Sequence, residues 1–159
     1  KVPLVAAGGV GDAKQFTDLL NMGYAAVQMG TRFIATTESK AHDDYKKAIL
    51  DANESDVVLT ERLTGVPVAV INTPTVKKFG TKAGPIARWL LKHKKAKHWV
   101  RLYYSLKSFR TLKHSSLKGV GYLDFFQAGK SVETIHDIPS AKQVVESFGE
   151  RWLTQRSKP

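Results

Sequence analysis

The sequence predicts an α/β fold that begins with two parallel strands joined by a helix. Residues 2–7 and 24–29 are short apolar runs, each followed by glycine. Runs of this length without polar alternation are typical of parallel strands that are buried on both faces. Between them, Phe16, Leu19 and Leu20 recur at helical spacing, which indicates one amphipathic helix. The three segments together take about 30 residues, the size of a right-handed crossover unit.

Helix-capping residues mark both ends of this first helix. Asp12 lies at the N-cap position, and Asn21, Met22 and Gly23 supply a C-terminal stop. Asp accepts hydrogen bonds from the first free amides of a helix, and glycine adopts the backbone turn that ends one. The helix is therefore expected between Asp12 and Asn21.

Glycine follows both predicted strands. Gly8 and Gly9 follow the first strand, and Gly30 follows the second. Parallel strands end at the same edge of a sheet, where glycines let the backbone approach a ligand and helix N-terminal amides bind phosphate. The alternative is that these glycines only serve tight turns. Their pairing favours a phosphate cradle, because the last two loops of an eight-stranded barrel form the recurrent phosphate site of that fold.

The following elements are a helix and a strand-rich stretch. Ser39 can cap a helix that runs through Ala52. Residues 57–74, VVLTERLTGVPVAVINTP, are rich in β-branched residues and indicate strands. Pro74 and the glycines at 80 and 84 are expected to mark loops.

Three more helices are expected towards the C-terminus. Apolar and aromatic residues recur at helical spacing after Pro85 and again after about Lys97. Pro139 is expected to start the last helix, since proline suits the first helical position. One side of this last helix is expected to carry Val144, Val145, Phe148 and Trp152.

Positive charge is concentrated in one region. The formal net charge is +11, yet no Asp or Glu lies between Glu61 and Asp124, and that region holds 14 of the 25 cations. A charge run of this kind is either a solvated face or a docking surface for an acidic partner. The candidate docking residues are Lys92, Lys94, Lys95 and Lys97.

Composition argues against several classes of protein. A hydrophobic content of 42% is typical of a globular chain rather than a disordered tail. There is no run of about 20 apolar residues and no signal-like start, so we expect a cytoplasmic protein without a membrane role. The aromatics of the basic region are explained by helical packing and accompany no nucleic-acid-binding motif, so no nucleic acid is expected as a partner.

Three blocks of the sequence carry a family resemblance. They are AAGGVGDAKQ, then GYAAVQMGTRFIATTES with AHDDYKKAIL behind it, and FFQAGKSVETIHDIPSAKQVVESF. Together they closely resemble the C-terminal half of the nitronate monooxygenase (2-nitropropane dioxygenase) family. That family also includes FMN-dependent enoyl-acyl-carrier-protein reductases and acyl-carrier-protein dehydrogenase/isomerases.

The resemblance implies a fold in three parts. Residues 1–60 correspond to strands 7 and 8 of a (β/α)8 TIM barrel, 61–118 to a strand-rich excursion with a basic helical insertion, and 119–159 to a return over the barrel mouth with the C-terminal helix. The barrel in this chain is thus expected to be incomplete. Its expected partner is the N-terminal half of the same protein.

The resemblance also implies the cofactor FMN, held chiefly at its phosphate. The implied contacts are Gly8, Gly9, Gln28, Met29, Gly30 and Thr31, with Arg32 as a neighbour. Where many relatives have Ala-Gly-Gln, this chain has Ala128, Gly129 and Lys130. We expect the Gly129 backbone near the flavin. Lys130 either faces the flavin, where its cation would stabilise a reduced anionic form, or points to solvent.

No catalytic residue is implied in this chain. The family's catalytic histidine precedes the three blocks, so none of the five histidines inherits that role. No metal site is expected either, because the histidines lack the partners that a metal requires. Cysteine is absent, although the use of NAD(P)H or of an iron–sulfur cluster by the whole protein is not decided by these residues. The histidines are His42, His93, His98, His114 and His136.

Two enzymatic activities and one binding role fit these observations. The first is an FMN-dependent oxidoreductase that oxidises small nitronates or related carbanion-like substrates. The alternative is an acyl-carrier-protein dehydrogenase/isomerase or enoyl-acyl-carrier-protein reductase of fatty-acid biosynthesis. Because carrier proteins are acidic, the alternative explains the acid-free region, which nitronate oxidation does not require. A basic binding module without activity is disfavoured by the intact AAGGV and QMGT blocks.

Overall fold

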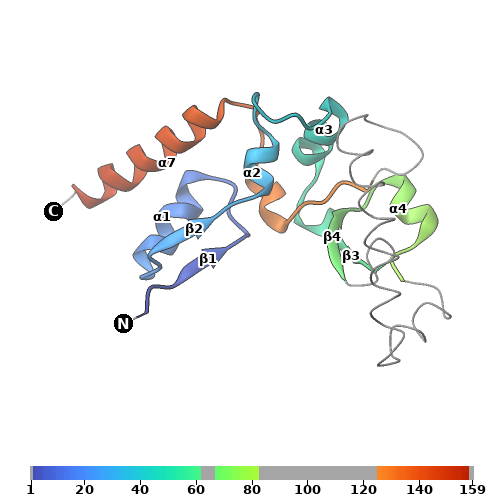
Figure 1. Ribbon diagram of the computed structural model, residues 1–159, viewed down its shortest axis with the longest axis horizontal. Coiled ribbons are helices and arrows are strands. Elements are labelled where there is room, and N and C mark those ends of the chain that lie inside the picture. The colour runs from blue at the N-terminus through green and yellow to red at the C-terminus, as the bar shows by residue number, and fades with distance from the viewer. Residues whose placement is uncertain (1, 62–66, 83–124, 158–159) are drawn as a thin grey trace.

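The computed structural model describes residues 2–61, 67–82 and 125–157. Figure 1 shows β1, β2, α1 and α7 on one side of the molecule, α3, β3, β4 and α4 on the other, and α2 between them. The two helices expected after Pro85 and Lys97 lie outside the described residues, as do the candidate docking residues Lys92, Lys94, Lys95 and Lys97. None of the helices in the described ranges is long and apolar enough to cross a membrane.

The predicted crossover unit is present at the N-terminus. Strand β1 (Val5–Ala7) pairs in parallel with β2 (Ala26–Gln28), and helix α1 (Ala13–Asn21) connects them. The Asp12 carboxylate caps α1 by accepting from the Gln15 backbone N–H at 2.7 Å. Gly23 follows the helix with φ +97°. Both predicted ends of this helix are therefore confirmed.

The expectation that these strands are buried on both faces is wrong for the described chain. Val5 is 57% exposed and Leu4 is 63% exposed. Among the described residues, β1 and β2 pair only with each other. One face packs on α1 and α7, where Val27 is partly buried, and the opposite face has no cover within the described ranges.

Two short helices follow β2. Helix α2 (Thr31–Ile34) begins directly after Gly30, and α3 (Asp43–Asp51) begins after His42. The expected start of the second helix at Ser39 is wrong. The Ser39 hydroxyl instead accepts from the Ala41 N–H at 3.3 Å, which is a local turn that competes with helix formation.

The stretch predicted to be strand-rich does contain strands, and they form an antiparallel pair. It begins with a 3₁₀ turn, η1 (Glu54–Asp56), which leads into β3 (Val57–Thr60), and β3 pairs with β4 (Val68–Ile71). Helix α4 (Pro74–Phe79) then starts where a loop was expected. The loop expectation at Pro74 is wrong because Thr73 caps the helix and proline occupies its first turn, where no amide hydrogen is needed.

The C-terminal segment returns across the molecule. Gln127 bridges to Val70 of β4, the 3₁₀ turn η2 (Lys130–Thr134) follows, and helix α7 (Ala141–Arg156) packs beside α1. Ser140 caps α7, so the predicted start at Pro139 is wrong by two residues.

The packing side of α7 is narrower than predicted. Val144 and Phe148 are buried, whereas Val145 is 61% exposed. Residues four apart share a helix face, and Val145 is turned away from the face that Val144 and Phe148 form.

Two hydrophobic clusters of the described residues pack the C-terminal segment against the elements that precede it. One joins α1 to α7 through Val10, Val144 and Phe148, with the rings of Phe16 and Phe148 5.5 Å apart. The other gathers residues of α2, α3, β4 and η2, and its fully buried members include Ile49, Val132 and Ile135. The return segment, residues 125–140, thus belongs to the same core as α2 and α3, the helices that follow Gly30.

Candidate functional site

The loops that follow β1 (residues 8–12, the first glycine loop) and β2 (residues 29–30, the second glycine loop) lie side by side at one edge of the strand pair. Ala7 is the register partner of Gln28, and the Gly8 N–H donates to the Gln28 carbonyl oxygen at 3.0 Å. The loops that leave the two strands therefore start from adjacent points. This is the juxtaposition that the sequence predicted from parallel pairing.

The backbone conformation of the first loop requires glycine at two positions, and the glycines of both loops border empty space. Gly8 and Gly9 have φ +82° and +76°, which L side chains rarely adopt. A Cβ atom at Gly8, Gly9 or Gly30 would meet no atom within 4 Å. The three predicted glycines thus border free space into which a ligand could fit.

Thr31 joins the second glycine loop to the return segment. Its hydroxyl oxygen accepts from the Gly129 N–H at 3.0 Å, although the two residues are 98 positions apart. Only 9% of Thr31 is exposed. Because a hydroxyl that accepts one hydrogen bond keeps its own proton to donate, Thr31 can still bind an anion. The structure therefore places Gly129 next to the predicted phosphate site.

Gln28 and Met29 differ in what they can offer a ligand. The Gln28 side chain is exposed on the uncovered face of the strand pair. The Met29 side chain packs against the cluster of Val10, Val144 and Phe148. Met29 is thus available to a ligand through its backbone, while Gln28 also presents its amide.

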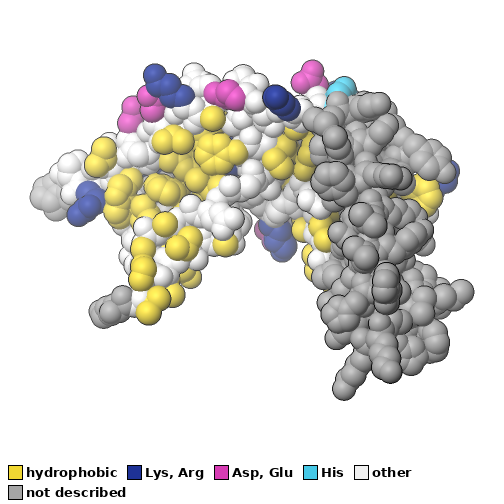
Figure 2. All heavy atoms as spheres, in the orientation of Figure 1, with side chains coloured by type: hydrophobic (Ala, Val, Ile, Leu, Met, Phe, Trp, Pro, Cys, Tyr) yellow, Lys and Arg dark blue, Asp and Glu magenta, His cyan; other side chains and the backbone are white. Residues whose placement is uncertain are grey.

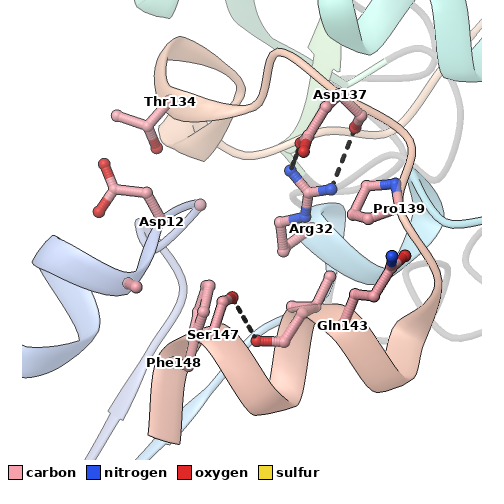
Figure 3. A pocket seen from close by; sticks show the side chains of 11 residues that line it. Asp12, Arg32, Thr134, Asp137, Pro139, Gln143, Ser147 and Phe148 are labelled. Atoms are coloured by element: carbon pink, nitrogen blue, oxygen red, sulfur yellow. Dashed lines mark hydrogen bonds and ion pairs between the residues drawn. The ribbon is translucent and has the colours of Figure 1, made fainter. Parts of the chain in front are cut away.

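Arg32 is buried in a structural ion pair. It is 4% exposed, and its Nη1 donates to Asp137 Oδ1 at 2.9 Å while Nη2 donates to the Asp137 carbonyl oxygen at 3.0 Å. Figure 3 shows the guanidinium group turned towards Asp137 at the wall of a pocket. Arg32 therefore ties α2 to the return segment, and its charge is already paired.

Lys130 pairs with an acidic side chain of η1. Its Nζ lies 2.5 Å from Glu54 Oε1 of η1, and both side chains are more than half exposed. Glu133 of η2 also accepts from the Glu54 backbone N–H at 2.7 Å. Lys130 is thus engaged by Glu54 in the described chain, and its position relative to a flavin stays a prediction.

The sequence interpretation missed Gly11. A Cβ atom at this position would lie 2.4 Å from Thr134 Oγ1 and 2.5 Å from the Ser131 carbonyl oxygen. The first glycine loop is therefore pressed directly against η2, and no side chain fits between them. The only sequence signal was a third glycine two residues after Gly9.

The described histidines and acids do not form a metal centre. His42 Nδ1 accepts from the Asp44 N–H at 3.2 Å as the cap of α3, and His136 is exposed. No group of three or more His, Asp or Glu side chains within the described ranges is arranged to hold a metal. The other three histidines lie outside those ranges.

Burial raises the pKa of Tyr45 to about 12. Its ring stacks on Phe126 with centroids 4.8 Å apart, and its hydroxyl donates to the Gln127 carbonyl oxygen. A phenol with this pKa stays protonated at neutral pH. Tyr45 therefore anchors the return segment rather than serving as a base.

Comparison with known proteins supports one family. The family model described as nitronate monooxygenase matches residues 1–150. A dehydrogenase from Mycobacterium tuberculosis, named for a 7a-methyl-1-oxo-octahydro-indene carboxyl-CoA, is 28% identical to this chain. The match covers 92% of this chain and 48% of the dehydrogenase. A probable nitronate monooxygenase from Staphylococcus saprophyticus is 39% identical over 49% of this chain and 22% of its own.

A solved structure agrees with these sequence matches. FabK from Thermotoga maritima superposes with a TM-score of 0.73 at 27% identity, covering 99% of this chain and 46% of that protein. The chain thus spans about half the length of the first relatives it matches. This coverage agrees with the expected partial barrel.

Proposed function

The chain belongs to the nitronate monooxygenase family, and we propose that it supplies the phosphate-binding part of the FMN site of an oxidoreductase. The observation that carries this proposal is the pair of open glycine loops at the end of two parallel strands. Each loop borders free space, and the Thr31 hydroxyl beside them keeps a proton to donate.

Each part of this edge has a role in the proposed site. The backbone of Gly8, Gly9 and Gly30 admits the phosphate, because no Cβ atom occupies the space beside it. The Thr31 hydroxyl donates to a phosphate oxygen, oriented by the Gly129 amide. When bound, FMN supplies the redox chemistry, while the protein binds and orients it.

The uncovered face of β1 and β2 indicates where the rest of the barrel packs. Figure 2 shows hydrophobic side chains gathered on the side that carries β1, β2 and α1. Val5 of β1 is 57% exposed, and its neighbour Ala6, which points to the opposite face, is partly buried. Apolar surface of this kind in a soluble fold normally meets a partner. We propose that the partner is the remaining six-stranded part of the same barrel, which also contributes the catalytic base.

The first candidate substrate is a small nitronate or a related carbanion-like compound. This is the activity of the family name, and the relative from Staphylococcus saprophyticus is a probable nitronate monooxygenase. A nitronate is a small anion that needs no docking surface outside the barrel. The test is oxidation of a nitronate by the complete protein under FMN-saturated conditions.

A second candidate is an acyl chain carried as a thioester on an acidic carrier protein. Two observations favour it: the acid-free region with 14 cations, and the relative from Mycobacterium tuberculosis, which is named as a carboxyl-CoA dehydrogenase. An acidic carrier would be steered to such a region, and its binding would weaken as salt shortens the Debye length to roughly 10 Å at 0.1 M.

One experiment distinguishes the two substrates. The complete protein is assayed with a nitronate, a carrier-bound acyl substrate and a carrier-free analogue, before and after Lys92, Lys94, Lys95 and Lys97 are changed to Glu. Each exposed charge contributes about 0.5 kcal/mol, so carrier docking predicts at least a tenfold higher KM for the carrier-bound substrate alone. Equal kinetics with that substrate in both proteins would refute docking at these lysines, and no turnover of it by the unmodified protein would remove the second candidate.

A further inference from the structure

A side-chain oxygen links the first glycine loop to the return segment by hydrogen bonds. Gln15 Oε1 accepts from the Gly11 backbone N–H at 2.9 Å and from the Thr134 hydroxyl at 3.0 Å. Gln15 and Thr134 are 119 positions apart. One amide oxygen therefore connects the end of the loop, the first turn of α1 and η2.

The Gln15 side chain is well placed to act as a rigid connector. Its own backbone N–H donates to Asp12 Oδ1 at 2.7 Å, so the residue is fixed within the capped first turn of α1. Thr134 is held in turn by the packing of η2, where Val132 and Ile135 are fully buried. Both partners of the loop thus belong to rigid elements.

The first glycine loop is also held at Val10, which is buried against α7, but its Gly11 end is not packed on that helix. A pocket of about 380 Å³ separates this end of the loop from α7, and Gly11, Asp12 and Thr134 lie on its wall. Figure 3 shows Asp12 and Thr134 on one side of the pocket and α7 on the other. On the outer side, Gly8 and Gly9 have no neighbour that a Cβ atom would meet within 4 Å. The loop is thus held at Val10 by packing and at Gly11 by the hydrogen bond to Gln15, while Gly8 and Gly9 border open space.

We infer that Gln15 and Thr134 are positioning residues for the phosphate-binding loop. This inference rests on the proposed FMN site and goes beyond it, because neither side chain belongs to the residues that would touch the phosphate. Glycine-rich segments have large conformational entropy when free. Fixing the loop at Gly11 lowers the entropy that is lost when the loop closes on its ligand, so the connection raises FMN affinity.

The test uses variants that remove or keep the shared contact. Thr134→Val removes the hydroxyl at nearly constant volume, and Thr134→Ser keeps it. Gln15→Leu removes the acceptor, and the double variant Gln15→Leu/Thr134→Val completes a cycle. Lys14→Ala is the control on the same helix, because Lys14 is exposed and pairs with Asp18 one turn later.

The measurements are the FMN dissociation constant of the complete apoprotein, from quenching of flavin fluorescence, and the urea midpoint without FMN. We expect Thr134→Val and Gln15→Leu each to weaken FMN binding about five- to tenfold, the size of one hydrogen bond. Thr134→Ser and Lys14→Ala should stay within about twofold of the wild type. The double variant should be no weaker than the worse single variant.

The outcomes that contradict the positioning role differ from the outcome that contradicts the proposed FMN site. Unchanged FMN affinity in Thr134→Val, or additive losses in the double variant, would overturn the positioning role. A lowered urea midpoint with unchanged affinity would show that the contact only stabilises the fold. If Thr134→Val does not fold, Gln15→Leu with Lys14→Ala as control provides the same test. A wild-type apoprotein that binds no FMN would instead refute the proposed function.

Discussion

Gly30→Glu is the sharpest test of the proposed phosphate site. Gly30 has φ −116°, a conformation that any residue adopts, and a Cβ atom there would meet no atom within 4 Å. The substitution therefore introduces neither backbone strain nor a clash within the described chain. This separates Gly30 from Gly9, whose φ of +76° would strain any other residue.

The size of the effect follows from electrostatics. Two like charges about 4 Å apart near a protein surface repel each other by about 4 kcal/mol. A Glu carboxylate at position 30 beside a bound phosphate should therefore weaken FMN binding by roughly a thousandfold. Stability of the apoprotein should change by less than about 0.5 kcal/mol, as is usual for an exposed position without special features.

The assay compares three variants of the complete protein. FMN affinity is measured by flavin fluorescence, and apoprotein stability by urea denaturation. Gly30→Gln has the shape of Gly30→Glu without its charge, so the ratio of their dissociation constants reports the charge alone. Gly30→Ala tests whether a methyl group by itself obstructs the site.

One result would refute the placement of the phosphate. If Gly30→Glu protein purifies with one FMN per chain and an affinity close to that of Gly30→Gln, no phosphate lies beside Gly30. A loss of affinity accompanied by unfolding of the apoprotein would contradict the structural part of the reasoning, namely that position 30 borders free space.

Three further outcomes are expected. The backbone hydrogen bond from the Ala141 N–H lowers the pKa of Glu38 below its ordinary value of 4.5. The contribution of the Glu38 carboxylate to stability is therefore present above pH 4.5 and is lost as the pH falls through the lower folded pKa. Glu38→Gln should remove this part of the acid sensitivity in urea melts recorded from pH 7 to pH 3. Asp137→Ala should lower the free energy of unfolding by about 1.5–3 kcal/mol, since it removes an acceptor from the buried Arg32 guanidinium. An unchanged urea denaturation curve would show that the bond from Arg32 to the backbone carbonyl of residue 137 suffices. The 159-residue chain expressed alone should be insoluble or free of FMN, because the outer edges of β1 and β2 would stay unpaired; a monomeric, cooperatively unfolding product with bound FMN would contradict the half-barrel interpretation.

Local sequence signals predicted the first crossover unit and the presence of strands in residues 57–74, whereas the antiparallel pairing is a finding of the structure. Asp12 and Gly23 act on backbone groups within one turn of themselves, so their effect can be read without knowing the rest of the fold. The same local logic failed at Ser39 and Pro74. Each residue had two local options, and the choice depended on neighbouring residues: Ser39 closes a turn with Ala41, while Pro74 starts a helix behind the Thr73 cap.

The fold brings part of the predicted site together. Gly8, Gly9, Gly30 and Thr31 come together because parallel pairing brings the ends of β1 and β2 to one edge. Their proximity was predictable from order along the chain, since a strand–helix–strand unit pairs its strands in parallel and so brings both carboxyl ends to one edge. Whether they bind FMN remains a prediction that the proposed experiments test.

What the sequence by itself determined is therefore the strand–helix–strand unit, the glycine edge and the uneven distribution of charge. Only the tertiary structure decided that Arg32 is engaged by Asp137, that Lys130 turns to Glu54, and that Gln15 connects the first loop to Thr134. The physical reason is the separation along the chain. Caps and turns depend on groups a few residues apart, whereas these three contacts span 76 to 119 positions. Such contacts form only after the hydrophobic clusters have brought the return segment against the strands, and no local pattern in the sequence encodes where it lands.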